Sequence, residues 1–289
     1  MIFEISDNKN WLKYLDDEGY VVLNNILTDD EQKDGMKLFW QDFKYVSPNF
    51  DINSEKNAPM MFAKGICVFS GFAQSNFMWY MRLRPNIIKI FEIIHNTQDL
   101  TVSFDGFSMF YTSKQKNPKP WWHIDQNPNN NIYCIQGSYN FLPVGENDAG
   151  YMVVPKSHKN FKPQNIKKND DWIVLDEIPE DGIKLIIPKN CFVLWNSRTI
   201  HQNIGINKNN KEFRLNRLTC YICYMPKSLR SNDVFEERIK AYHNGDATSH
   251  WSHKCEIKKF PYGFALTYVK KNFNTIKANE LTEDRLKYI

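Results

Sequence analysis

Apolar residues recur at two different spacings along the chain, helical in the N-terminal part and strand-like beyond about residue 100. Between Met36 and Phe43 they mark one face of a helix, and Thr28 and Glu31 match the capping box that begins such a helix. A strongly apolar run at 86–95 predicts a second helix. Side chains on these faces are expected to form core rather than to bind a ligand.

Short apolar runs alternate with Asn-, Gly- and Pro-rich turn signals from residue 100 to 226. The predicted strands are 101–112, 121–126, 132–142, 150–154, 183–187, 191–195 and 212–224. Many short strands at this spacing are typical of a β-sandwich, a barrel or a jelly roll. A further helix is predicted at 232–243, with Ser231 as its N-cap and Gly245 just past its end.

A long segment with little periodicity, 49–80, lies between the first helices. Loops of this length in compact domains are often lids or binding loops. The segment holds several large apolar residues that a solvated loop would not favour: Phe50, Met60, Met61, Phe62 and Phe69. We expect it to close over a pocket together with the stretch 248–251; burial against the domain's own core is the alternative.

Composition narrows the class of protein. The chain has 289 residues, 42% hydrophobic and 24% charged, which suits one globular domain with a sizeable core. Its net charge of +4, from 37 basic and 33 acidic residues, is too small and too dispersed to indicate a nucleic-acid partner. No apolar run approaches the ~20 residues of a membrane helix, and no signal peptide is visible.

The six cysteines indicate a reduced, cytoplasmic protein rather than a disulfide framework. Several of them lie in strand-like apolar runs, where buried free thiols are common. Cys220 and Cys223 have the CxxC spacing, but no second pair is present to complete a zinc site. We interpret them as structural.

Metal-binding chemistry is suggested by His123 and Asp125. In an extended strand, residues two apart point to the same face, so the imidazole and the carboxylate can project together. A second histidine would complete the 2-His-1-carboxylate arrangement that holds non-haem Fe(II) and leaves positions open. His201 is the best candidate. For a lone His-x-Asp, a polar strand edge is the ordinary alternative.

Two arginines follow His201 on one predicted strand. The guanidinium fork pairs bidentately with a carboxylate and keeps its charge, as binding the far end of a keto acid requires. Arg217 shares strand parity with Thr219 and Tyr221, a row expected to line the inside of a barrel. Arg214 is expected to face the other way, unless a bulge intervenes, and suits a surface ion pair better.

These motifs together resemble the phytanoyl-CoA dioxygenase family of Fe(II)/2-oxoglutarate oxygenases. The resemblance runs from about residue 12 to 255 and rests on His123-x-Asp125, the segment 150–158, His201 and Arg217. It implies an α+β fold with a double-stranded β-helix core, a cupin-like jelly roll. In a single domain at 1–289, that core would occupy 100–226. N-terminal helices at 1–99 and a C-terminal helix and loop extension at 227–289 would flank it.

The resemblance also implies the site. His123, Asp125 and His201 match the iron ligands, and Arg217 matches the residue that binds the C5 carboxylate of 2-oxoglutarate. Asn203 falls at a polar 2-oxoglutarate contact. The His-to-Arg gap is often shorter in the family, which leaves Arg214 as the alternative anchor. Halogenating members replace the acidic ligand, so Asp125 favours hydroxylation.

Four further residues are candidates for the pocket. Trp121 shares parity with His123 and is expected to form a wall. Gln126 should point away from the metal, either to orient a ligand or to bond to backbone. His250 and Trp251 are candidates at the mouth, although histidines late in the chain are more commonly solvent-exposed. His158 is expected to be structural.

The predicted function is therefore an Fe(II)/2-oxoglutarate-dependent dioxygenase that uses O₂ to hydroxylate a small molecule, releasing succinate and CO₂. A cupin-like metal enzyme or binding protein that uses no 2-oxoglutarate is the alternative. A non-catalytic interaction module is a third, and it would be expected to lack a ligand. No nucleic-acid or membrane partner is expected.

Overall fold

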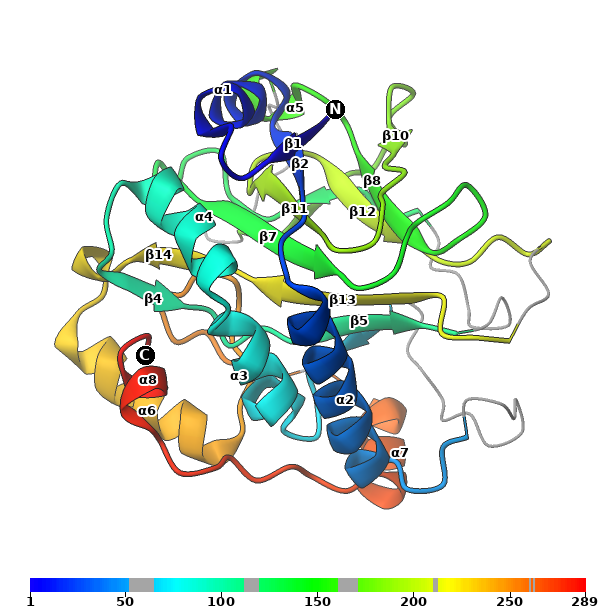
Figure 1. Ribbon diagram of the computed structural model, residues 1–289, viewed down its shortest axis with the longest axis vertical. Helices are drawn as coiled ribbons and strands as arrows, with labels where there is room; N and C mark the ends of the chain where they lie inside the picture. Colours follow the sequence, from blue (N-terminus) through cyan, green and yellow to red (C-terminus); the bar gives the residue numbers. More distant parts are fainter. Residues whose placement is uncertain (52–64, 112–119, 161–170, 210–212, 260, 262) are drawn as a thin grey trace. The chain divides into compact units, whose positions relative to one another are not determined.

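The computed structural model describes residues 1–51, 65–111, 120–160, 171–209, 213–259, 261 and 263–289 (Figure 1). The chain forms two compact units. One takes the described parts of Met1–Asn25, Met61–Gly65 and Met109–Leu218, and the other takes those of Ile26–Met60, Ile66–Ser108 and Thr219–Ile289. The organisation of 1–289 as a single domain stays a prediction.

The first unit is built from two layers of mostly antiparallel strands. Strands β1 (Ile2–Glu4), β2 (Tyr20–Asn24), β11 (Cys191–Asn196) and β7 (Ile135–Asn140) pair in that order, with only β1 and β2 parallel. A five-stranded sheet has the order β10 (Ile183–Lys184), β8 (Gly150–Val153), β12 (His201–Ile204), β6 (His123–Ile124) and β9 (Ile173–Val174). Antiparallel pairing between strands distant in sequence matches the predicted jelly roll.

Two helices, α1 (Asn8–Glu18) and α5 (Ser157–Asn160), belong to the same unit. Helix α1 ends at Gly19, whose φ of 81° lies in the left-handed region. A Cβ atom at this position would lie 2.4 Å from His158 Nδ1 and 2.6 Å from Thr199 Oγ1, so only glycine fits. His158 Nε2 lies 2.8 Å from the Asp16 carbonyl oxygen, which gives this histidine the structural contact that its turn predicted.

The second unit is mainly helical. It contains α2 (Asp29–Val46), η2 (Phe72–Gln74), α3 (Asn76–Arg82), α4 (Pro85–His95), η3 (Lys227–Leu229), α6 (Asn232–Asn244), α7 (Gly263–Asn272) and α8 (Glu283–Leu286). Its strands include β3 (Ile66–Cys67), β4 (Leu100–Val102) and β14 (Tyr224–Pro226). The rings of Phe39, Phe72, Phe77 and Phe107 pack edge to face at its centre, at centroid distances such as 4.9 Å for Phe72 and Phe107.

The predicted helix ends are confirmed. The Thr28 side chain accepts from the Glu31 backbone N–H while the Glu31 carboxylate accepts from the Thr28 N–H, a complete capping box. Helix α6 begins after Ser231, whose hydroxyl accepts from Val234 N–H, and ends at Gly245 with φ 76°.

No helix among the described residues is both long and apolar enough to cross a membrane.

The strand predictions differ from the structure in length. The stretch 101–112 forms two strands, β4 and β5 (Phe107–Phe110), and 212–224 contributes β13 (Arg217–Ile222). Only His123–Ile124 of 121–126 pairs as a strand. Strand β12 was missed because its residues are polar and show no apolar alternation.

The segment 49–80 is described only in part. Its residues 65–80 form the short elements β3, η2 and most of α3. Phe69 is buried, and the ring of Phe50 packs on that of Phe43 with centroids 5.0 Å apart. These two residues therefore pack against the protein's own core, which was the alternative to closing over a pocket. Met60, Met61 and Phe62 lie outside the described residues.

Candidate metal centre

Two histidines occupy the centre of the five-stranded sheet. His201 on β12 lies directly opposite His123 on β6 in the strand register. Directly opposite residues of an antiparallel pair project to the same face, so both imidazoles point to one side of the sheet. Their ring centroids are 4.2 Å apart, and both residues are only 4% exposed.

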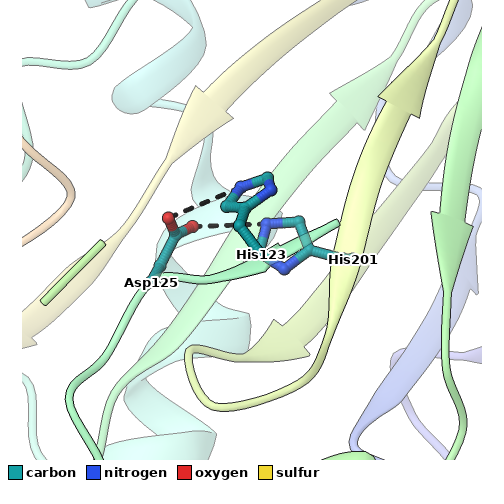
Figure 2. A group of neighbouring side chains, drawn as sticks. All are labelled: His123, Asp125 and His201. Carbon is teal, nitrogen blue, oxygen red and sulfur yellow. Dashed lines mark ion pairs between the residues drawn. The ribbon is translucent and has the colours of Figure 1, made fainter. Parts of the chain in front are cut away.

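Asp125 completes the cluster (Figure 2). Its Oδ1 lies 3.6 Å from His123 Nε2, and its Oδ2 lies 3.3 Å from His201 Nε2. Ligand atoms of the three residues all lie within 4.8 Å of one another. Because ligand–metal bonds are about 2.0–2.2 Å long, donors at these separations fit around a single divalent ion. Asp125 lies beyond the end of β6, where its N–H donates to the Ser197 carbonyl at 2.9 Å.

Backbone contacts select the tautomer of both rings. His123 Nδ1 lies 2.9 Å from the Trp121 carbonyl oxygen, and His201 Nδ1 lies 2.9 Å from that of Thr199. A carbonyl only accepts, so each Nδ1 must carry the proton and donate it. Each Nε2 therefore presents its lone pair toward Asp125, the arrangement expected of metal-binding histidines.

Gln136 is a residue that sequence reasoning missed. Its Nε2 donates to Asp125 Oδ2 at 2.9 Å from strand β7. Trp195 on β11 lies directly opposite Gln136 in the register, and its ring is 5.5 Å from that of His201. A signal was present, since a Gln inside a buried strand must find a hydrogen-bond partner, but only the fold reveals which one.

Arg217 and Asn203 lie together beside the histidines. Asn203 lies on β12 two residues after His201, on the same face, and its Oδ1 accepts from Arg217 Nη1 at 2.9 Å. The same Nη1 donates to the Gly150 carbonyl at 3.0 Å, and Arg217 is only 2% exposed. Arg214 instead has a half-exposed side chain 3.4 Å from Asp148 Oδ1. This agrees with the assignment of Arg217, rather than Arg214, to the inner face.

Trp121 and Gln126 differ in their relation to the metal centre. The Trp121 indole stacks on His123 at 4.2 Å with an interplanar angle of 12°, and its Nε1 donates to the Asn203 carbonyl. Gln126 is buried, and its Nε2 donates to the carbonyls of Asn130 and Ile132 at 2.6 and 2.8 Å. Trp121 thus packs directly on His123, while its role as a pocket wall stays a prediction, and Gln126 makes the backbone bonds that were its alternative role.

His250 and Trp251 belong to the second compact unit. Trp251 is 1% exposed, with its ring 4.7 Å from His250 and 5.6 Å from His253. Burial lowers the pKa of His253 to about 4, and the neighbouring Lys254 charge adds to the shift. A role for His250 and Trp251 at the pocket stays a prediction.

Comparison with known proteins gives distant relatives. No model of a known protein family matches the chain. It is 25% identical over 273 residues to "Ava biosynthesis cluster protein O" of Aspergillus versicolor, covering 85% of this chain and 86% of the relative. It is 24% identical over 226 residues to "Putative phytanoyl-CoA dioxygenase" of Dictyostelium discoideum, covering 62% of this chain and 61% of the relative.

Solved structures show the same fold. The epimerase SnoN, crystallised with Fe³⁺, α-ketoglutarate and nogalamycin RO, matches with a TM-score of 0.55 at 14% identity. The match covers 77% of this chain and 84% of SnoN. The predicted fold class, a jelly-roll core with flanking helices, is confirmed.

Proposed function

We propose that this phytanoyl-CoA dioxygenase-like chain is an Fe(II)- and 2-oxoglutarate-dependent oxygenase that hydroxylates a small molecule. The observation that carries the proposal is the His123, Asp125 and His201 cluster, with both histidine Nε2 atoms directed at the carboxylate. This is the donor set of the facial triad, which leaves positions open for other ligands.

The side chains around the cluster suit a second anionic ligand. Arg217 is buried next to Asn203, and its fixed positive charge is matched to a carboxylate. In the proposed complex Arg217 holds the far carboxylate of 2-oxoglutarate, while Asn203 keeps the guanidinium in place. When bound, Fe(II) and 2-oxoglutarate supply the oxidising chemistry with O₂, yielding succinate and CO₂.

The remaining residues hold the ligands and shield them. Gln136 fixes the rotation of the Asp125 carboxylate, and the carbonyls of Trp121 and Thr199 hold the two imidazoles. The rings of Trp121 and Trp195 pack beside these histidines and limit the access of water. Segments 49–80 and 248–251 remain candidates for closing the pocket.

A small-molecule substrate and a cytoplasmic location are parts of the same proposal. SnoN, one of the proteins with a similar structure, was crystallised with a small molecule, nogalamycin RO, which supports this substrate class. The six cysteines carry free thiols, and five of them are buried, as suits a reduced compartment.

The test is anaerobic addition of Fe(II) and 2-oxoglutarate together. We expect a metal-to-ligand charge-transfer band in the visible spectrum, which requires the keto acid to chelate the metal. His123→Ala should abolish the band, while His243→Ala, which changes an exposed histidine of α6, should leave it intact. Metal uptake without the band would favour a cupin-like protein that uses no keto acid. A succinate-release screen over a metabolite library would then identify the substrate.

A further inference from the structure

One row of residues crosses the whole five-stranded sheet. The register places Ile183, Val153, His201, His123 and Val174 opposite one another in that order, from β10 to β9. All five side chains therefore project to the metal face of the sheet. Val153 is 0% exposed and both histidines are 4% exposed, but Val174 is 43% exposed. Among the residues that the structure describes, the metal face is exposed at the β9 edge, one strand from His123.

Alternation along β9 separates two kinds of contact. Ile173 and Leu175 pack with Trp122 and Ile124 in a hydrophobic cluster on the other face of the sheet. Val174 and, by the same parity, Trp172 belong to the metal face. The Trp172 ring lies 6.1 Å from the His123 ring at an interplanar angle of 60°, and the residue is 52% exposed.

The opposite edge of the sheet is less suited to entry. Ile183 on β10 is also 41% exposed, but it lies two strands from His201. At 4.7–4.9 Å between strands this is about 10 Å, compared with about 5 Å between β9 and His123. A substrate that reaches the metal centre over the β9 edge must cross Trp172 and Val174.

The turn that follows β9 is acidic. Asp176, Glu177, Glu180 and Asp181 are all exposed. Both ends of this turn are anchored at Trp122, the neighbour of His123: Leu175 N–H donates to the Trp122 carbonyl at 2.8 Å, and Gly182 packs against its ring. Lys184, the basic residue that follows, is turned inward, where its Nζ donates to three carbonyls at 2.6–2.8 Å.

We propose that Trp172 and Val174 form the substrate-binding wall and that the substrate presents an uncharged apolar ring to them. The inference rests on the proposed function and adds its substrate class. A flat apolar ring covers the exposed indole and the valine, which gains the energy of their burial and of ring packing. The acidic turn repels phosphates, so an acyl-CoA is disfavoured despite the family's name.

The first test uses 6-fluoro-2-naphthol as an uncharged ring probe with the Mn(II)-loaded protein. Mn(II) in the three-residue site should strongly relax the ¹⁹F signal of a probe bound at the β9 edge. Trp172→Ala should weaken binding about tenfold, the size of one lost aromatic contact, and Trp172→Phe should retain most of it. Val174→Ala should have a smaller effect in the same direction. Probe binding without paramagnetic relaxation would overturn the proposal.

The control substitution is Ile186→Ala. Ile186 is 54% exposed beyond β10, at the other end of the sheet, and its neighbours Leu185 and Ile187 are buried. It matches the wall residues in exposure and apolarity but not in position, so its loss should leave probe affinity unchanged. Equal losses of probe affinity in Ile186→Ala and Trp172→Ala would show that the probe adheres to apolar surface in general. That result would contradict the proposal that Trp172 and Val174 form the binding wall.

A second experiment tests whether the acidic turn disfavours ligands that carry a phosphate. 6-Fluoro-2-naphthyl phosphate should bind at least several-fold more weakly than the naphthol, and neutralising Asp176 and Glu177 to Asn and Gln should narrow the gap. Equal affinity of the two probes would overturn the selection against phosphates. Equilibrium dialysis of both probes with metal-free protein separates the wall from the proposed function. If Mn(II) does not bind, the proposed function fails, and the dialysis still decides whether Trp172 binds the ring.

Discussion

Gln136 holds the Asp125 carboxylate from outside the cluster. It donates to Oδ2 at 2.9 Å, while that oxygen also faces His201 Nε2 at 3.3 Å. Without this donor we expect the carboxylate to be held less firmly toward the two histidines. Residues of this kind tune a metal site without touching the ion.

Gln136→Leu should therefore weaken Mn(II) or Fe(II) binding about 10- to 100-fold, the usual effect of removing a partner of a metal ligand. Calorimetric titration of the metal measures it. Gln74→Leu is the matched control, because Gln74 is also buried and hydrogen-bonded, to Trp79 and the Asp246 carbonyl in the second unit. That variant should lose stability but keep its metal affinity. Unchanged affinity in Gln136→Leu would leave Gln136 a purely structural residue.

The two arginines of the 213–218 region should differ sharply in their effect on 2-oxoglutarate. Arg217 is buried beside Asn203, whereas Arg214 is half-exposed near Asp148. Arg217→Met should raise the Kd for 2-oxoglutarate roughly 30- to 150-fold, since a buried bidentate charged pair contributes on the order of 2–3 kcal/mol. Arg214→Met should change it little. Titration of 2-oxoglutarate into the Mn(II)-loaded variants measures both Kd values. A larger increase in Arg214→Met than in Arg217→Met would refute the assignment of Arg217 as the 2-oxoglutarate anchor.

At the scale of elements, the end of helix α1 packs within its unit at one glycine. Gly19 takes φ 81°, and its Cα faces His158 and Thr199 closely enough that no Cβ fits. His158 lies in α5, and Thr199 lies two residues before His201, a proposed metal ligand whose ring it holds through its carbonyl. The turn between α1 and β2 is thus packed against the segment that leads to the metal centre.

Gly19→Ala should destabilise the protein by more than Gly245→Ala. Both glycines end helices in the left-handed region, where alanine costs about 1–2 kcal/mol. At Gly245 the nearest atoms to an added Cβ are 3.5 Å away, an ordinary contact, while at Gly19 they are 2.4 and 2.6 Å away. Denaturant unfolding of the two variants measures the difference. Equal losses would mean that His158 and Thr199 move aside freely.

Elements with a regular apolar pattern could be predicted from the sequence, and elements shaped by the site could not. Helix α6 was predicted at 232–243, between Ser231 and Gly245, because its caps and its period agree. Strand β12 was missed because His201 and Asn203 occupy the face that apolar residues fill elsewhere. The grouping of His123, Asp125 and His201 was predicted from residue type and spacing, whereas the contact of Gln136 becomes visible only once β7 is placed beside Asp125.

At the scale of the whole molecule, partly or fully buried histidines in both compact units link stability to pH. The pKa values of His95, His158 and His253 all lie below the usual value, and burial is the largest cause in each case. A backbone carbonyl opposes the shift at His95 and at His158. At His253 the nearby Lys254 charge lowers the pKa further, to about 4.

Stability should therefore fall on acidification. Between about pH 6.5 and pH 4 these histidines bind protons more readily in the unfolded chain than in the folded one, so protonation favours unfolding. The stabilising contribution is complete above about pH 6.5 and is lost as the pH falls toward the folded pKa values. His253→Gln should flatten this dependence, because it removes the histidine whose pKa is lowered to about 4. His243→Gln, at an exposed position of α6, should not flatten it. Urea unfolding from neutral to mildly acidic pH provides the comparison, and an equal slope in the wild type and His253→Gln would show that another group governs the acid response.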